Sequence, residues 1–345
     1  LAAGAIHKLG MERLDVFLDT AGIRQPISRR VLKSLLETLR DSEQLGSLLR
    51  LEDVIPSLVA GEQERFIKDG QQLDTAGWAL NQFGTEAGQK EFWEILTVQI
   101  EQALNLFIKS ENQVLAGQSF FAGETVKGLR LLELLSNRYD VVVTNPPYMS
   151  ARKMNDRLKT LIGRHYPDGK RDLYAAFIER CLELAGSCGR VGMLTMHSFM
   201  FISSYEKLRS KVRGKACIDT LTHLGPGLFA VGNPGTLQTA AYALCVEREV
   251  QRRNEAVGTY FRLVKEPDGD TKRRRFESAL EALESGQNDP LIFRYRQGDF
   301  DAIPGSPLVY WITPGLRHLF EHSTKLGEIA QPRQGLATAD NFRFL

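Results

Sequence analysis

Hydrophobic and polar positions change their period along the chain, which predicts a helical first third followed by alternating strands and helices. Apolar residues recur at three- and four-residue spacing in residues 31–39 and 92–108, as they do on one face of a helix. Pro26 and Pro56 interrupt this pattern. We therefore expect residues 1–110 to form a helical region that packs on the sheet that follows it.

A short apolar run at residues 140–144, Asp-Val-Val-Val-Thr, predicts a strand that is buried on both faces and central in a parallel sheet. Two prolines follow it, and neither can donate a hydrogen bond to a sheet. Asn145 precedes a proline, which favours an extended backbone. Ligands of open α/β sheets bind at the carboxyl ends of strands, so we expect residues 145–148 to lie in an open cleft.

The pattern after this loop predicts that the sheet continues. Apolar residues share one face of a helix at Leu173, Phe177, Cys181 and Leu184. Glycines at 186–189 are typical of a helix end, and a buried strand is expected at 191–195. His197, directly after that strand, is interpreted as a hydrogen-bonded loop histidine rather than a ligand or a base. Further strands are expected at 218–224 and 236–246, the latter in an antiparallel hairpin.

Charged residues become frequent after this part of the chain. A helix at 205–212 is expected to expose Lys207, Arg209 and Lys211, and the basic run 272–275 is expected to be a solvated face that can contact phosphates. The proline-containing stretch 300–311 resembles a domain boundary. The sequence therefore predicts three regions, which are residues 1–110, 111–250 and 251–345.

Composition narrows the class of protein without deciding it. Hydrophobic residues make up 43% and charged residues 25% of 345 residues, as in ordinary globular proteins, and the net charge of +2 neither requires nor opposes nucleic acid. The sequence shows no apolar run of transmembrane length and no secretory signal, so we expect a cytoplasmic protein without membrane contact. No metal site is expected, because no two cysteines have C-x-x-C spacing; free thiols are the simpler interpretation of Cys181, Cys188, Cys217 and Cys245.

The residues Asn145, Pro146, Pro147 and Tyr148 carry the clearest chemistry. After a hydrophobic strand, this tetrapeptide resembles motif IV of the amino-methyltransferases that use S-adenosyl-L-methionine, above all the DNA adenine-N6 enzymes. The resemblance implies a Rossmann-like α/β methyltransferase sheet. It also implies that the Asn145 side-chain oxygen and the Pro146 carbonyl accept hydrogen bonds from the target amine, while Tyr148 stacks on a flipped-out base. Catalysis would then rest on positioning and preorganised dipoles.

The order of the other segments is similar to that of the PglX-like adenine-specific DNA methyltransferases of BREX phage-defence systems, which are related to type IIG restriction-modification methyltransferases. This resemblance implies site-specific methylation of adenine in double-stranded DNA, with other BREX defence proteins as possible partners. The segments that carry it are residues 140–150, 171–180, 193–209, 236–246, 303–311 and 334–345.

The resemblance also assigns residues to the cofactor. Asp172 and Tyr174, at the start of a helix, would line the cofactor and base pocket, and Asp41 is also assigned to the cofactor. Such enzymes carry a glycine-rich loop before the Asn-Pro-Pro-Tyr strand, but no such loop occurs here. We therefore expect the loop to precede Leu1, so that this fragment presents one wall of the pocket. Residues 251–345 would be a linker and the start of the target-recognition region.

Other functions remain open at the level of the sequence. The first alternative is the methyltransferase part of a type IIG restriction-modification enzyme. More remote alternatives are a methyltransferase that acts on protein glutamine or on RNA, and a non-catalytic scaffold that binds DNA. A glycine-rich loop before Leu1 would favour an enzyme over a scaffold.

Overall fold

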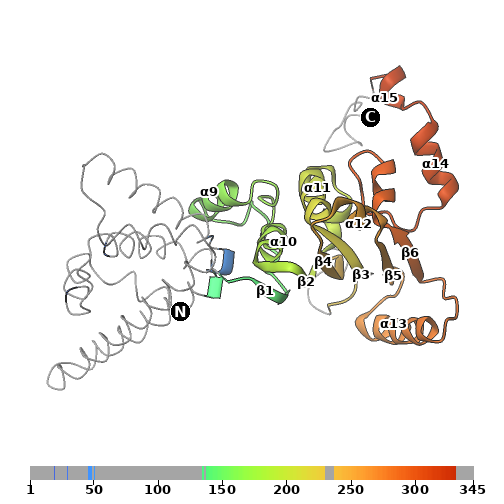
Figure 1. Ribbon diagram of the computed structural model, residues 1–345, viewed down its shortest axis with the longest axis horizontal. Helices are drawn as coiled ribbons and strands as arrows, with labels where there is room; N and C mark the ends of the chain where they lie inside the picture. Colours follow the sequence, from blue (N-terminus) through green and yellow to red (C-terminus); the bar gives the residue numbers. More distant parts are fainter. Residues whose placement is uncertain are drawn as a thin grey trace, which may run out of the picture. The chain divides into compact units, whose positions relative to one another are not determined.

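The computed structural model describes residues 19, 29, 46–48, 50, 134–135, 137–229 and 237–331. The chain forms two compact units, one comprising residues 1–139 and 149–172 and the other residues 140–148 and 173–345 (Figure 1). The helices expected at 31–39 and 92–108, and Asp41, lie outside the described residues.

The described residues form a six-stranded sheet with the strand order β1-β2-β4-β3-β5-β6 (Figure 1). β4 is antiparallel to both β2 and β3, β5 is parallel to β3, and β6 is antiparallel to β5. This mixed sheet with helices confirms the predicted α/β class. The strands are β1 Tyr139–Thr144, β2 Ala185–Met196, β3 Ala216–Gly225, β4 Thr239–Val246, β5 Val257–Arg262 and β6 Ile292–Arg296.

The expected position of the strand before Asn145 was wrong for the part of the chain that the structure describes. β1 is the end strand of the described sheet, not a central one. Val141 and Val143 are 62% and 76% exposed, whereas Val142 packs partly against the core. Side chains alternate between the two faces of a strand, so only one face of β1 meets the core. The β-branched run reflects strand propensity, and burial was inferred from it incorrectly.

The helix that follows the loop is confirmed, but the turn expected after it is not. α10 spans Leu173–Leu184, and Leu173, Cys181 and Leu184 are buried as the apolar pattern predicted. β2 begins at Ala185, without a glycine turn between helix and strand. The left-handed backbone in this stretch belongs to Cys188, with φ 63°. Glycine permits a helix stop but does not force one, and sheet formation prevailed here.

Side-chain caps mark several helix starts. The Asn155 side chain accepts a hydrogen bond from the Leu158 backbone N–H in α9, and Asp268 accepts one from Thr271 in α13. The remaining helices are α9 Asp156–His165, α11 Glu206–Lys215, α12 Val250–Glu255, α13 Gly269–Glu284, α14 Pro314–His322 and α15 Leu326–Ile329. Short 3-10 helices occur at η1 Gly46–Leu48, η2 His197–Met200, η3 Ser203–Tyr205 and η4 Gln297–Ala302.

The sheet and its core continue past residue 250, where the sequence placed a boundary. On β5, the buried Tyr260 stacks on Tyr310 with ring centroids 4.5 Å apart, and the next residue, Phe261, contacts Phe276 of α13. Since neighbouring strand residues point to opposite faces, α13 and the Tyr310 segment cover opposite faces of β5. The stretch 300–311, expected to be a boundary loop, packs into the core through Phe300, Leu308 and Tyr310. The three-region division of the chain stays a prediction.

Two cations that the sequence placed in solvent are buried. Arg209 of α11 is 2% exposed and Lys272 of α13 is 1% exposed. The Arg209 guanidinium donates four hydrogen bonds to backbone carbonyls, those of Phe199 (3.0 Å), Ile202 (2.7 Å) and Gly305 (3.0 and 2.7 Å). The Lys272 ammonium donates to the carbonyls of Leu263 and Glu266. Long aliphatic stems let these cations reach clustered carbonyls inside the fold, so the expectation of solvation was wrong for both.

None of the helices among the described residues combines the length and the apolar character that a membrane span requires.

Candidate active site

The Asn-Pro-Pro-Tyr loop leaves the carboxyl end of β1, and its residues differ in exposure. Asn145 and Pro147 are exposed, Pro146 is buried and Tyr148 is half-buried. The two proline rings restrict the backbone between the amide and the phenol. The loop is therefore open to solvent at Asn145, as expected, while a cleft around it stays a prediction.

The Tyr148 hydroxyl has a positioning role that the sequence did not reveal. It lies 3.1 Å from the Oδ1 atom of Asn145 and 3.1 Å from the carbonyl oxygen of Leu194 on β2. Burial raises the pKa of Tyr148, so at neutral pH the hydroxyl keeps its proton and acts as a donor. It therefore both anchors the ring to β2 and orients the amide oxygen of Asn145, although one proton cannot fully serve both acceptors at once.

Tyr174 packs behind Tyr148 instead of lining an open surface. The two rings meet edge to face, with centroids 6.4 Å apart and planes at 89°. Tyr174 is 1% exposed, its hydroxyl lies 3.4 Å from Ser198 Oγ, and its ring also contacts Tyr205. This arrangement supports the Tyr148 ring from one edge. The assignment of Tyr174 to the cofactor stays a prediction.

Asp172 belongs to the other compact unit, where it holds the chain segment that follows the loop. Its carboxylate accepts a hydrogen bond from the Met149 backbone N–H at 3.0 Å, and Asp172 also forms an isolated β-bridge with Ser150. Next to it, the Ala151 N–H donates to the carbonyl of Arg171. Asp172 thus fixes the residue directly after Tyr148 in the chain. Its predicted contact with the cofactor is untested, and Asp41 lies outside the described residues.

His197 is hydrogen-bonded, as the sequence predicted, and its partner is a second histidine. Its Nδ1 lies 2.7 Å from Nε2 of His223, whose Nδ1 lies 3.1 Å from the Tyr310 hydroxyl. Burial lowers the pKa of His197. For His223, burial and then the positive charges of His197, Arg262 and Lys272 lower the pKa to about 3. Both rings are therefore neutral at pH 7, and no spacing in the sequence indicated this pair.

The pair should make the stability of the protein sensitive to mild acid. The folded pKa of His223 lies below its ordinary value, so its contribution is complete above about pH 6.5 and is lost as the pH falls toward 3. At pH 5 this loss amounts to roughly 2 kcal/mol. The variant His223→Gln should therefore lose about 2 kcal/mol less unfolding free energy than the wild type between pH 7.5 and 5. Urea denaturation at both pH values measures this, and parallel losses in the two proteins would contradict it.

An α/β sheet with an Asn-Pro-Pro-Tyr loop at the end of β1 defines a fold of the S-adenosylmethionine-dependent methyltransferase class. The family model of the Eco57I restriction-modification methylases matches residues 29–229, which include this loop. The chain belongs to this family.

Two curated relatives of the chain are adenine-specific methyltransferases. The chain is 32% identical over 292 residues to the adenine-specific methyltransferase PglX of Lacticaseibacillus casei (strain Zhang), a match that covers 81% of this chain and 23% of the relative. It is 31% identical over 232 residues to the adenine-specific methyltransferase BrxX of Escherichia coli O9:H4 (strain HS), a match that covers 66% of this chain and 17% of the relative. These matches confirm the predicted resemblance to PglX-like methyltransferases. The chain spans less than a quarter of the length of either relative.

Among solved structures, the chain also matches a nuclease-deletion mutant of the type ISP restriction-modification enzyme LlaGI in complex with a DNA substrate mimic. The TM-score is 0.40 at 13% identity, and the match covers 60% of this chain and 18% of that chain.

Proposed function

We propose that the protein is a site-specific DNA methyltransferase that transfers a methyl group from S-adenosyl-L-methionine to N6 of a flipped-out adenine, in BREX-type phage defence. The observation that carries this proposal is the exposed Asn145 amide, whose Oδ1 is oriented by the Tyr148 hydroxyl at the end of β1. The proposal is supported by family membership and by two relatives named as adenine-specific methyltransferases. Double-stranded DNA would be the substrate, and the cytoplasm, where bacterial DNA lies, the site of action.

The acceptor set of the loop suits the methylation of an aromatic amine. The lone pair of an exocyclic adenine amine is delocalised into the ring, so the amine is a weak nucleophile. Asn145 Oδ1 and the Pro146 carbonyl would accept from its two N–H groups and localise the lone pair on nitrogen. The nitrogen would take the methyl group as the carbon–sulfur bond of the donor breaks, with the bonding electrons left on sulfur, and one of these protons would then pass to water. Because these acceptors are fixed before the reaction, the gain comes from positioning and preorganised dipoles.

This donor and acceptor chemistry fits a strongly activated methyl donor, because the loop contributes acceptors but no strong base. S-adenosyl-L-methionine supplies a methyl group on a positively charged sulfur. We retain Asp172 and Tyr174 as the residues beside which it would be held. In this structure the Asp172 carboxylate accepts a hydrogen bond from the Met149 N–H. The Tyr174 ring contacts the Tyr148 ring, so Tyr174 also orders the loop that presents the acceptors.

The most direct test of the proposed function is a comparison of bacterial methylomes. Cells that carry the complete gene should contain N6-methyladenine at one position of a defined DNA sequence, and cells without the gene should lack it. A complete gene with Asn145→Ala should behave like the deletion. Unmodified DNA in cells that express the intact protein and its neighbouring genes would contradict the proposal.

Two substitutions of Tyr148 separate the role of its ring from the role of its hydroxyl. Tyr148→Ala should weaken retention of the flipped adenine by roughly 1–3 kcal/mol, the typical value of stacking on one base. Tyr148→Phe keeps the ring but loses the one hydroxyl proton that Asn145 and Leu194 share, a hydrogen bond worth about 0.5–1.5 kcal/mol. We therefore expect Tyr148→Phe to retain base binding and to lose turnover by up to about tenfold.

Fluorescence of 2-aminopurine at the target position measures base flipping, and single-turnover methylation measures the chemical step. Tyr295→Phe is a matched control, because it removes a tyrosine hydroxyl from β6. If Tyr148→Phe lost as much base binding as Tyr148→Ala, the division of roles between ring and hydroxyl would be wrong.

The family also supports a second candidate, the methyltransferase part of a type IIG restriction-modification enzyme. The chain is 26% identical over 126 residues to the type II restriction enzyme and methyltransferase RM.Eco57I of Escherichia coli. This match covers 33% of this chain and 13% of the relative. The complete protein would then cleave unmethylated DNA by itself. A BREX methyltransferase would methylate without cleaving, and its association with other BREX proteins can be tested by affinity purification and mass spectrometry.

A further inference from the structure

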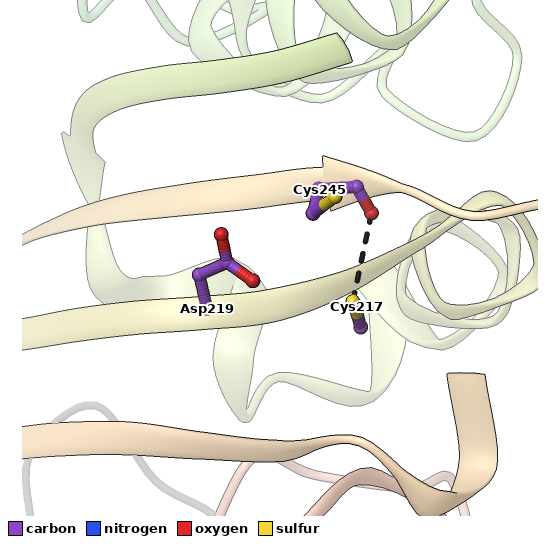
Figure 2. A group of neighbouring side chains, drawn as sticks. All are labelled: Cys217, Asp219 and Cys245. Atoms are coloured by element: carbon purple, nitrogen blue, oxygen red, sulfur yellow. Dashed lines mark hydrogen bonds between the residues drawn. The ribbon is translucent and has the colours of Figure 1, made fainter. Parts of the chain in front are cut away.

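Two neighbouring strands bring together three potential metal ligands that are far apart in the sequence. Cys217 and Asp219 lie on β3 and Cys245 lies on β4 (Figure 2). Their two sulfurs and a carboxylate oxygen all lie within 4.8 Å of one another. Cys217 is paired directly with Cys245 in the antiparallel register, and its Sγ lies 3.7 Å from the Cys245 carbonyl oxygen.

A β-bulge adds the carboxylate to this pair of thiols. The register of β3 against β4 shifts between Ile218 and Thr220, so Asp219 is the extra residue on β3. Its side chain points toward the strand that carries Cys245 (Figure 2). Bulges re-aim single side chains, and this one supplies an oxygen ligand beside two sulfur ligands.

The neighbouring strand β2 contributes two further groups. Arg190 is paired with Cys245 in the register and forms an ion pair with Asp219. Cys188 is exposed, has a left-handed backbone with φ 63°, and precedes Arg190 on the same strand. The cluster therefore has a fixed positive charge beside it, and a third thiol lies on the same neighbouring strand.

We propose that Cys217, Asp219 and Cys245 bind a zinc ion, with a water molecule in the fourth position. Cysteine thiolates and aspartate oxygens are both zinc ligands, and two thiolates favour zinc over magnesium or calcium. Sulfur ligands about 2.3 Å from a tetrahedral zinc lie roughly 3.8 Å apart, so the present spacing requires shifts of about 1 Å or less among these three ligands. This site is independent of the proposed methyl transfer.

The charges of the cluster balance around a divalent cation. Two thiolates and one carboxylate carry three negative charges, which zinc and the Arg190 guanidinium together neutralise. Burial raises the pKa of the Cys217 and Cys245 thiols, whereas Arg190 lowers both. Zinc must therefore displace protons from sulfur, and the apparent affinity should rise with pH.

A second group of metal-binding residue types, His318, Glu321 and His322 on α14, is less suited to hold an ion. All three residues are exposed, and they come from adjacent turns of one short helix. Nδ1 of His322 lies 3.0 Å from the carbonyl oxygen of His318. The strand cluster instead draws its ligands from β3 and β4 and lies partly inside the fold.

The test is metal binding by the full-length protein, purified under reducing conditions and freed of metal with a chelator. Added Co²⁺ should produce the sulfur-to-cobalt charge-transfer absorption at one ion per chain. Competition with a chromophoric chelator gives the zinc affinity. Cys217→Ser and Cys245→Ser should each weaken zinc binding by more than about 100-fold, because even groups that only orient ligands are worth about 10–100-fold.

Cys181→Ser is the matched control, because Cys181 is a buried cysteine of α10 outside the cluster. It should bind zinc as the wild type does. Circular dichroism shows whether the serine variants fold. If they do not fold, the stoichiometry of metal binding by the wild type and the pH dependence of its zinc affinity test the proposal. The proposal is overturned if the wild type shows no thiolate absorption with Co²⁺, or if Cys181→Ser weakens zinc binding as strongly as Cys217→Ser. A Cys217–Cys245 disulfide in protein freshly isolated from cells would also overturn it.

Discussion

Replacing Asn145 with alanine should lower the single-turnover rate of adenine methylation by about 10²–10³-fold, the typical effect of removing one preorganised polar contact to a developing charge. The variant lacks the Oδ1 atom that the Tyr148 hydroxyl orients, so the amine lone pair is no longer localised from this side. Affinity for DNA should change little, because phosphate contacts supply most of it. Radiolabelled methyl transfer to a duplex with one target site measures the rate, and fluorescence anisotropy measures DNA binding.

Asn254→Ala is a suitable control for this experiment. Asn254 is an exposed asparagine of α12, so its replacement removes the same amide without touching the loop. Turnover in this control should match the wild type. A wild-type rate in Asn145→Ala would show that the loop is a strand end with two prolines and has no catalytic role.

Replacing Arg209 with methionine should destabilise the fold by at least about 3 kcal/mol. The substitution keeps an aliphatic stem but leaves the carbonyls of Phe199, Ile202 and Gly305 without the guanidinium that serves them. The carbonyl of Phe199 is buried and those of Ile202 and Gly305 are partly buried. An acceptor that loses its partner inside the fold costs about 1–3 kcal/mol. Denaturation in urea gives the change in unfolding free energy. Arg209→Lys should recover only part of it, because a lysine has three donors and lacks the planar fork of arginine.

Arg273→Met on α13 provides the comparison at an exposed position, where substitutions usually change stability by less than about 0.5 kcal/mol. Similar small effects in Arg209→Met and Arg273→Met would mean that water replaces the guanidinium at the three carbonyls. In that case Arg209 would not connect α11 to the segment around Gly305.

Local sequence patterns were sufficient for several elements. The apolar spacing of α10 predicted its buried face, and the strands expected at 218–224 and 236–246 correspond to β3 and β4. Two prolines after a β-branched run predicted where β1 ends and why Asn145 lies outside the core. These features depend on residues close together in the chain, so the sequence carries them directly.

Burial of single residues was less predictable, because it depends on elements that are distant in the sequence. The β-branched residues of β1 indicated a strand but not its place at the end of the described sheet. Arg209 and Lys272 look like surface cations in the sequence. Arg209 is buried against the carbonyl of Gly305, 96 residues away in the chain. Lys272 binds the carbonyls of Leu263 and Glu266, so its burial depends on the conformation of the segment before α13.

By itself, the sequence determined the α/β class, the position of α10 and of most described strands, and the Asn-Pro-Pro-Tyr loop that links the chain to its family. Only the tertiary structure decided that the Tyr148 hydroxyl reaches both Asn145 and Leu194, that His197 meets His223, and that Cys217 faces Cys245. The contacts of Tyr148 with Leu194, of His197 with His223 and of Cys217 with Cys245 depend on which strands the sheet brings together. Strand order is set by packing across the whole sheet, and no local spacing encodes it.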